Sequence, residues 1–335
     1  MLSTVLILIG SMVLVLISSL LLVNALEWLG HHLKLGSSFV GAILSPMFTS
    51  LPELIVILIA IFSTAGNVGD EIGIGTIFGE PFMVSSLSYG LLGIAVIAGF
   101  LAKKRSTSTL SIDKTLALPF IFIIVLFPLT LIPGFINITW LKYLFGIFFL
   151  VAFIFYIQLM YRRRMAVLIE ESEGIIFARW LPESTSFQWG ALIVQVVAAM
   201  CLIFFGSELL VSSVEKVSQG INISPLGFAL IIVPFATAIP ETITALIWGY
   251  RGKDTLSIGS LVGEKILYST FYPALGLFLT PWVLDFHAVF SVIVTTLVSL
   301  VILYFILKGR LSWYGLSIGI VFFVAYAILV FVAKL

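Results

Sequence analysis

Charged residues are scarce in this sequence. Lys, Arg, Asp and Glu make up 10% of its 335 residues, whereas hydrophobic residues make up 61%, and the mean hydropathy is +1.23. A soluble protein carries roughly 25% charged residues and cannot hide this much apolar surface from water. The composition therefore excludes a soluble globular domain and predicts that a lipid bilayer surrounds most of the chain.

Cysteine, histidine and the common catalytic motifs are also rare or missing. The single cysteine, Cys201, excludes an intramolecular disulfide, and no GxSxG, Walker A or GxGxxG motif stands in the strand context that it requires. The adjacent His31 and His32 lack the i, i+4 spacing of a zinc-binding helix, and we expect them in the first loop. His287 is expected at a membrane interface. The sequence therefore predicts no enzyme and no resident cofactor.

Ten segments are apolar over the roughly 20 residues that a membrane-spanning helix needs. No basic residue precedes the first segment, unlike the start of a cleaved signal peptide, so we expect that segment to be retained. The segments lie near residues 4–26, 37–62, 73–100, 115–134, 137–160, 188–213, 222–249, 257–282, 286–307 and 313–333. We predict an all-α integral membrane protein with ten transmembrane helices.

One sizeable polar connection, at 161–186, divides the chain. It separates a first five-helix repeat at 1–160 from a second five-helix repeat at 187–335. Because five is an odd number, the second half enters the membrane with opposite polarity. If the halves are related in sequence, they form the inverted repeat of a secondary transporter.

Two motifs recur in the same order in both halves. Pro-x-x-Thr-x-x-Pro-Glu occurs at 46–53 and again at 234–241, and an Ile-Gly segment ending in Gly-Glu occurs at 74–80 and again at 258–264. Chance apolar similarity would not preserve carboxylates at matching positions. The halves are therefore predicted to be inverted copies of each other.

Basic residues indicate the orientation, because Lys and Arg concentrate on the cytoplasmic side. Three lie on the opposite side (Lys142, Lys216 and Lys334), and Lys265 lies within a helix. Thirteen share the side of the 161–186 linker: Lys34, Lys103, Lys104, Arg105, Lys114, Arg162, Arg163, Arg164, Arg179, Arg251, Lys253, Lys308 and Arg310. We predict outside termini and a cytoplasmic linker, most simply in the plasma membrane.

Glu53 and Glu241 stand near the middle of their helices, each directly after a proline. An ionisable group at the bilayer centre costs roughly 2.5–3.5 kcal/mol on insertion scales and is a functional site by default. For one such motif, the alternative is a proline kink with a glutamate bonded to a neighbouring helix. Two symmetric copies disfavour that alternative.

The same prolines predict oxygen ligands. Proline lacks an N–H and clashes with the carbonyl one turn earlier, so the helices should break and free carbonyls near Thr49 and Thr237. A carbonyl, a threonine hydroxyl and a carboxylate together suit a hard cation such as Ca²⁺, Na⁺ or Mg²⁺.

Two further carboxylates, Glu80 and Glu264, follow Gly79 and Gly263. Small residues allow close helix approach, so we expect these glycines to bring the third and eighth helices against the broken ones. Four carboxylates would then converge at the pseudo-two-fold axis. They carry too much negative charge for one divalent ion, so some should hold protons when the site is empty and release them when the cation binds.

Two other charged residues leave alternatives open. Lys265 points about 100° away from Glu264 on a helix, and it either neutralises another acid of the site or forms a structural ion pair. Glu208 is either an accessory of the site or a residue near the outer interface.

These motifs resemble a known superfamily. The runs at 49–53 and 237–241 resemble the two signature repeats of the cation/calcium exchanger superfamily, typified by sodium/calcium exchangers, and the segments at 74–79 and 258–263 match their continuation. The resemblance implies ten helices with outside termini, and alternating access through movement of the first and sixth helices. The residues that it implies for the central cation site are Thr49, Ser50, Glu53, Thr237 and Glu241.

The chain also departs from the superfamily pattern. Ala238 replaces a serine, and Glu80 and Glu264 replace serines that follow glycine. Val84 and Tyr268 replace an amide or carboxylate one turn later. The replaced positions supply cation ligands in the family, so these departures favour proton coupling, or a different divalent ion, over standard sodium coupling.

We therefore predict a secondary active antiporter that moves a divalent cation, with Ca²⁺ expected, in exchange for H⁺. Its partners are inorganic cations and the bilayer, without nucleic acid, and the sequence sets no oligomeric state. The predicted metal-site residues are Glu53, Glu241, Glu80, Glu264, Thr49, Thr237 and Ser50, with Glu80 and Glu264 also carrying protons. The alternatives are a Na⁺-coupled calcium exchanger, a cation channel, a Mg²⁺ or Mn²⁺ transporter, and a membrane-embedded metal enzyme using His31 and His32.

Overall fold

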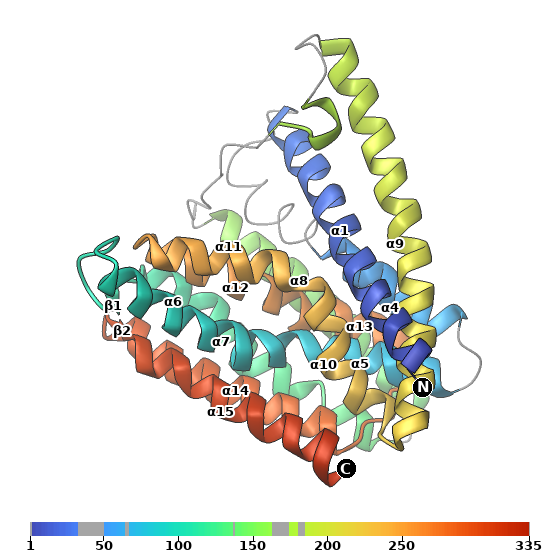
Figure 1. Cartoon of the computed structure of the whole chain (residues 1–335). Coiled ribbons are helices and arrows are strands. Elements are labelled where there is room, and N and C mark those ends of the chain that lie inside the picture. The colour runs from blue at the N-terminus through green and yellow to red at the C-terminus, as the bar shows by residue number, and fades with distance from the viewer. Residues whose placement is uncertain are drawn as a thin grey trace.

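The computed structural model describes residues 2–32, 50–63, 67–136, 138–162, 174–179 and 185–334. This part of the chain is a bundle of helices (Figure 1). The helices are α1 (Leu2–His32), α4 (Leu51–Ser63), α5 (Asn67–Met83), α6 (Tyr89–Leu101), α7 (Ala117–Leu129), α8 (Thr139–Arg162), α9 (Thr185–Ile221), α10 (Pro225–Thr237), α11 (Ile239–Tyr250), α12 (Asp254–Ser269), α13 (Phe271–Leu279), α14 (Phe286–Leu307) and α15 (Trp313–Ile328). Its only strands are the two-residue β1 (Thr109–Leu110) and β2 (Leu311–Ser312). The predicted all-α class is confirmed.

Seven helical runs of the described chain are long and apolar enough to cross a membrane on their own. They are Leu2–Leu26, Asn67–Leu101, Lys114–Phe135, Thr139–Met160, Phe187–Ile221, Phe286–Leu307 and Trp313–Ala333. The helices α10 and α11 form one bent pair, and α4 is a shorter apolar helix. The helices α12 and α13 are 16 and 9 residues long, so neither spans a bilayer alone. The count of ten stays a prediction.

The first helix is longer than predicted. It continues through His32, so the expectation that His31 and His32 lie in a loop is wrong. No proline interrupts the helix before this point, and His32 stacks on Trp28 one turn earlier, with ring centroids 3.9 Å apart. Trp28 also packs edge-on against Trp189 of α9, at 5.5 Å. The helix therefore ends in aromatic contacts.

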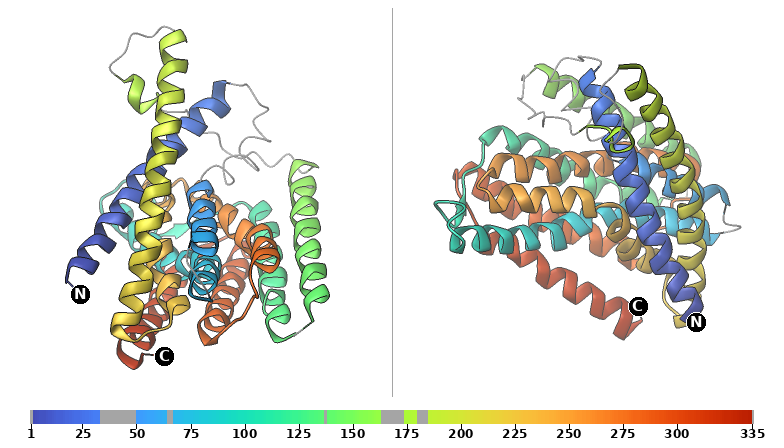
Figure 2. Two further views of the ribbon diagram at one scale, coloured as in Figure 1. Left: turned by 90° about the vertical axis from the view of Figure 1, so that its right-hand side faces the viewer. Right: turned by 45° about the horizontal axis from the view of Figure 1, so that its top comes forward.

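Connections rich in basic residues meet at one end of the bundle. The strands β1 and β2 pair antiparallel, with Thr109 opposite Ser312 and Leu110 opposite Leu311. Their pairing joins the α6–α7 connection to the α14–α15 connection. The ends of the described chain lie at the opposite end of the bundle (Figure 1, and the right panel of Figure 2). The orientation of the chain in the membrane stays a prediction.

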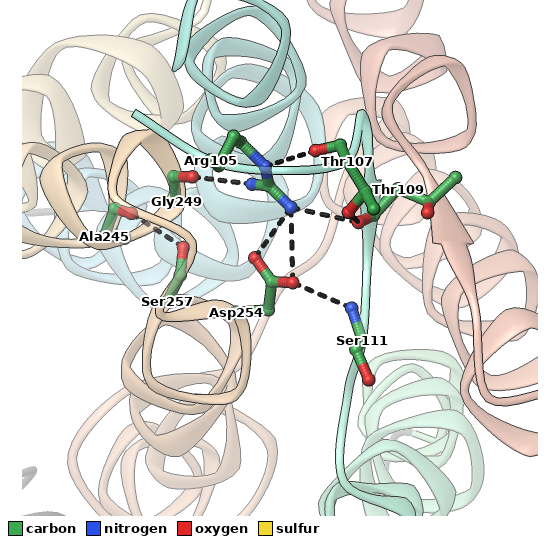
Figure 3. A network of polar contacts seen from close by, with 8 residues as sticks. All are labelled: Arg105, Thr107, Thr109, Ser111, Ala245, Gly249, Asp254 and Ser257. Atoms are coloured by element: carbon green, nitrogen blue, oxygen red, sulfur yellow. Dashed lines mark hydrogen bonds and ion pairs between the residues drawn. The ribbon is translucent and has the colours of Figure 1, made fainter. Parts of the chain in front are cut away.

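A network around Arg105 ties the α6–α7 connection to the α11–α12 corner (Figure 3). The guanidinium of Arg105 pairs with Asp254 at 3.0 Å and donates to the carbonyl of Gly249 at 2.6 Å. The backbone N–H of Ser111 donates to Asp254 at 2.8 Å. Ser257 donates to the carbonyl of Ala245 at 2.6 Å, which holds α12 against α11.

Helix contacts occur in matching sets in the two halves of the chain. The helices α4 and α5 pack together, as do α11 and α12. The helix α5 packs on α14 and α12 packs on α7, while α6 packs on α15 and α13 packs on α8. The helices α1 and α9 pack against each other and cross the rest of the bundle obliquely (Figures 1 and 2).

Candidate cation-binding site

The second-half signature lies at a helix break. The helix α10 ends at Thr237, Ala238 has φ −85° and ψ 0°, and α11 begins at Ile239 with Pro240 in its first positions. The two helix axes are bent by 62°. A proline cannot continue the hydrogen-bond ladder of the preceding helix. The predicted break at Pro240 is therefore confirmed, and it places Thr237 and Glu241 on either side of the bend.

The first-half signature is described from Ser50 onward. The helix α4 begins at Leu51 and carries Glu53 in its first turn, as α11 carries Glu241. Both carboxylates thus lie at a helix N-terminus, where the macrodipole favours negative charge. Thr49 lies outside the described residues, so its liganding role and a break before Pro52 stay predictions.

Glycines bring α5 against α10. A Cβ atom on Gly75 would lie 2.6 Å from the carbonyl oxygen of Leu226, and one on Gly79 would lie 2.5 Å from that of Leu230. Only glycine permits this backbone approach, so the expectation for Gly79 is confirmed. For Gly263 of α12 it stays a prediction. The close contact of α5 places Glu80 beside the broken helix.

The four predicted carboxylates come from four different helices. Glu53 of α4, Glu80 of α5 and Glu264 of α12 are 4%, 1% and 5% exposed, and Glu241 of α11 is partly buried. The charge of Glu264 acts on each of the other three, and Glu53 acts on both Glu80 and Glu241. The structure therefore brings the four carboxylates together as electrostatic neighbours.

Several of these buried oxygens have no hydrogen-bond partner. They are Oε2 of Glu53, both carboxylate oxygens of Glu80, and Oε2 of Glu241. An unsatisfied buried carboxylate is costly, and a bound cation or a proton relieves that cost. Within the described residues, no three His, Cys, Asp or Glu side chains form a ready metal-ligand cluster. The carboxylates are electrostatic neighbours, and their joint coordination of one ion stays a prediction.

Hydroxyl groups accompany the carboxylates. Thr237 is 1% exposed, and its side chain lies within hydrogen-bond reach of the Glu53 carboxylate. Its hydroxyl also donates to the carbonyl of Val233 at 3.1 Å. Ser50 is 2% exposed. Thr237 and Glu53 thus form a contact between the two signature motifs, across the halves of the chain.

Two tyrosines of the second half also belong to this region, and the sequence analysis did not assign them to the site. The rings of Tyr268 and Tyr272 lie 4.4 Å apart. Tyr272 donates to the carbonyl of Ser50 at 2.6 Å, and both phenols are close enough to Glu53 to interact with its charge. The signal in the sequence was the i, i+4, i+8 spacing of Glu264, Tyr268 and Tyr272.

The structure bears on the alternatives that the sequence left open for Lys265 and Glu208. Both alternatives for Lys265 gave it an acidic partner. Its ammonium instead donates to Ser85 at 2.7 Å and to Ser299 at 3.0 Å, and it forms no ion pair with a described acid. Glu208 lies exposed on α9, which favours the interface position over an accessory role.

A helical membrane bundle that buries carboxylates beside a broken helix has the architecture of an ion transporter. The chain belongs to the sodium/calcium exchanger protein family, whose model matches residues 3–162 and 191–334. It is therefore an integral membrane protein of the cation/calcium exchanger superfamily, a group of transporters.

The chain is similar to the following proteins at low sequence identity. An uncharacterized membrane protein of Methanocaldococcus jannaschii is 21% identical over 244 residues, covering 72% of this chain and 70% of that protein. The crystal structure of the H⁺/Ca²⁺ exchanger CAX superposes with a TM-score of 0.72 at 18% identity, covering 97% of this chain and 82% of that chain. A structure of the sodium-calcium exchanger NCX_Mj superposes with a TM-score of 0.59 at 18% identity, covering 97% of this chain and 98% of that chain. These likenesses show the fold.

Proposed function

We propose that this protein is a secondary active antiporter that exchanges Ca²⁺ for H⁺ across the plasma membrane. The observation that carries the proposal is the set of buried carboxylate oxygens without hydrogen-bond partners on Glu53, Glu80 and Glu241. A carboxylate in this position binds either a cation or a proton. Competition between the two at one set of groups couples their movements without a separate proton pathway.

The proposed roles of the site residues follow from their positions. Glu53 and Glu241 are the principal cation ligands, because each stands in the first turn of its helix, and Glu241 directly follows the break at Pro240. Glu80 and Glu264 carry protons as well as ligand oxygens, and Thr49, Ser50 and Thr237 contribute uncharged oxygen. Hard divalent cations take six to eight oxygen ligands, so hydroxyl and carbonyl groups must complete the coordination. The small relative movements that complete it are part of the transport cycle.

The helices α1 and α9 are the mobile pair in this proposal. They pack on each other and cross the bundle that holds the carboxylates (Figures 1 and 2). Their joint tilt would open the site to either side of the membrane in turn. The resemblance to the superfamily supports this division, because its first and sixth helices correspond to α1 and α9.

The ten-helix inverted repeat is also a proposal. It consists of residues 1–160, a cytoplasmic linker at 161–186, and residues 187–335, with the termini outside. The packing of α4 on α5 matches that of α11 on α12, and the packing of α6 on α15 matches that of α13 on α8; both matches support the repeat. The family model also matches two separate stretches, at 3–162 and 191–334.

The test is calcium flux into proteoliposomes. Sodium-free vesicles with an acidic lumen should take up Ca²⁺ as protons leave, and the uptake should stop when an ionophore removes the pH gradient. Mg²⁺ and Mn²⁺ are tested in the same way. Uptake that ignores pH and requires a Na⁺ gradient would instead identify a sodium-coupled exchanger, and conductance without countertransport would identify a channel.

A further inference from the structure

The Lys265 side chain is buried inside the helix bundle. The residue follows Glu264 in α12 and is 0% exposed. Its ammonium donates a hydrogen bond of 2.7 Å to the hydroxyl of Ser85, in the π-helical turn Val84–Ser88, and one of 3.0 Å to the hydroxyl of Ser299 in α14. Both serines are fully buried.

Aromatic faces complete the surroundings of this ammonium. The ring of Tyr89 in α6 lies 5.3 Å from the nitrogen, and the ring of Phe120 in α7 lies 5.8 Å from it. Both distances are within the range of cation–π attraction. Four elements beside α12 therefore contribute to one enclosure, which is lined by hydroxyl oxygens and ring faces.

Within the described part of the chain, no carboxylate borders this enclosure. Among the described residues, no carboxylate oxygen lies within 4.0 Å of the Lys265 nitrogen, since the ion pairs found there involve Arg105 with Asp254 and His287 with Asp285. Buried charges are normally paired. Hydroxyl oxygens and aromatic faces are nevertheless groups that can coordinate a monovalent cation.

The corresponding position of the first repeat holds no cation. There Pro81 follows Glu80, as Lys265 follows Glu264. A basic side chain at this position is therefore a feature of one half of the core. It stands beside a carboxylate of the transport site without being paired to any described carboxylate.

We propose that the Lys265 ammonium fills a monovalent-cation position built from the Ser85 and Ser299 hydroxyls and the faces of Tyr89 and Phe120, and thereby excludes an alkali ion from the core. The inference rests on the proposed exchanger function and deepens it. A position that the protein's own side chain occupies cannot bind Na⁺, so it cannot couple Na⁺ movement to Ca²⁺ movement. Removing the side chain would vacate the position for Na⁺.

Two substitutions distinguish the effect of the Lys265 charge from the effect of the volume that its side chain occupies. Lys265→Ser removes both the charge and the volume, whereas Lys265→Met removes the charge but keeps an unbranched side chain in the enclosure. Only Lys265→Ser should gain a Na⁺ site. Adding Ser85→Ala to Lys265→Ser should remove the gain, since it deletes one of the oxygen ligands.

The measurement is the melting temperature of the detergent-purified protein in NaCl against choline chloride at equal ionic strength, with LiCl and KCl as further ions. We expect a saturable Na⁺-specific rise of about 2–4 °C in Lys265→Ser beyond that of the wild type and Lys265→Met. Equal responses in all three proteins would overturn the proposal. This readout is ion binding, so it is independent of whether calcium flux depends on pH.

The wild type gives a second measurement that does not depend on how the variants fold. A saturable Na⁺ response of the wild type that Ser85→Ala abolishes would show an alkali ion already bound at these hydroxyls, and it would overturn the proposal. A wild-type response unchanged by Ser85→Ala supports it. Lys265→Thr repeats the gain-of-site test with a second small hydroxyl residue.

Discussion

Arg105 and Asp254 form an ion pair buried at the end of the bundle that carries β1 and β2. The distance between Nη2 of Arg105 and Oδ1 of Asp254 is 3.0 Å, and the two side chains are 2% and 9% exposed. The same guanidinium donates to the carbonyls of Gly249, Thr107 and Thr109 (Figure 3). One side chain thus joins the α6–α7 connection of the first half to the α11–α12 corner of the second.

Arg105→Ala should destabilise the protein strongly. Removing one partner of a buried pair leaves an uncompensated charge, at a cost of about 3–5 kcal/mol. The melting temperature in detergent should fall accordingly, and Arg105→Lys should recover only part of the loss because lysine cannot donate in the same fork. The exposed neighbour Lys104→Ala is the control and should change little. A wild-type melting temperature in Arg105→Ala would show that the network contributes nothing to stability.

Glu53→Gln and Glu241→Gln should each abolish Ca²⁺ transport while leaving a folded, monodisperse protein. At an effective dielectric constant of 20, a unit charge ~4 Å from a cation contributes several kcal/mol, so the affinity should fall by at least about 100-fold. Ca²⁺ binding and flux are measured on the same preparations. Glu208→Gln, on the exposed face of α9, is the matched control and should transport normally. Normal flux in both site variants would remove them from the site.

Gly79→Ala should push α5 away from α10. The added methyl group would meet the Leu230 carbonyl at 2.5 Å and the Pro234 ring at 2.8 Å, and overpacking costs about 1–3 kcal/mol. We expect a lower melting temperature together with reduced flux, since the displaced helix carries Glu80. Gly10→Ala meets nothing within 4 Å and should be neutral or slightly stabilising through helix propensity. Equal effects of the two substitutions would contradict the packing argument.

Replacing Glu80 and Glu264 together by serine should weaken the dependence of Ca²⁺ uptake on pH. These two residues supply titratable groups at positions where the superfamily pattern has serine. The double variant should keep Glu53 and Glu241 as ligands but lose much of the response to a stepped pH gradient in sodium-free vesicles. An unchanged pH response would assign the exchanged protons to other groups.

Cysteine labelling tests the proposed orientation. Cys201 is first replaced by serine, and single cysteines are then placed at Lys103, in the α6–α7 connection, and at Val283, in the α13–α14 connection; both positions are exposed. A membrane-impermeant maleimide added to intact cells should label position 283 and spare position 103. The reverse pattern would invert the topology.

Much of this architecture follows from local sequence. The apolar runs predict helices in a bilayer because any other backbone would leave polar groups unsatisfied in lipid. Pro240 predicts the break between α10 and α11 because it cannot extend the ladder of the helix before it. The repeated Pro-Glu and Gly-Glu motifs predict the four carboxylates that the structure brings together.

Other features depend on how the helices rotate and slide against one another. The partners of Lys265 are hydroxyls at residues 85 and 299, although the sequence suggested an acid. Tyr272 reaches the Ser50 carbonyl across 222 positions of the chain.

The sequence by itself determined the class of protein, the helix break at Pro240 and the carboxylate positions, since each depends on residues within one or two helical turns. Only the tertiary structure decided which oxygen meets the Lys265 ammonium and how closely Gly79 approaches Leu230. The physical reason is that lipid is as apolar as the protein interior, so no hydrophobic face of these helices marks the side that must be buried.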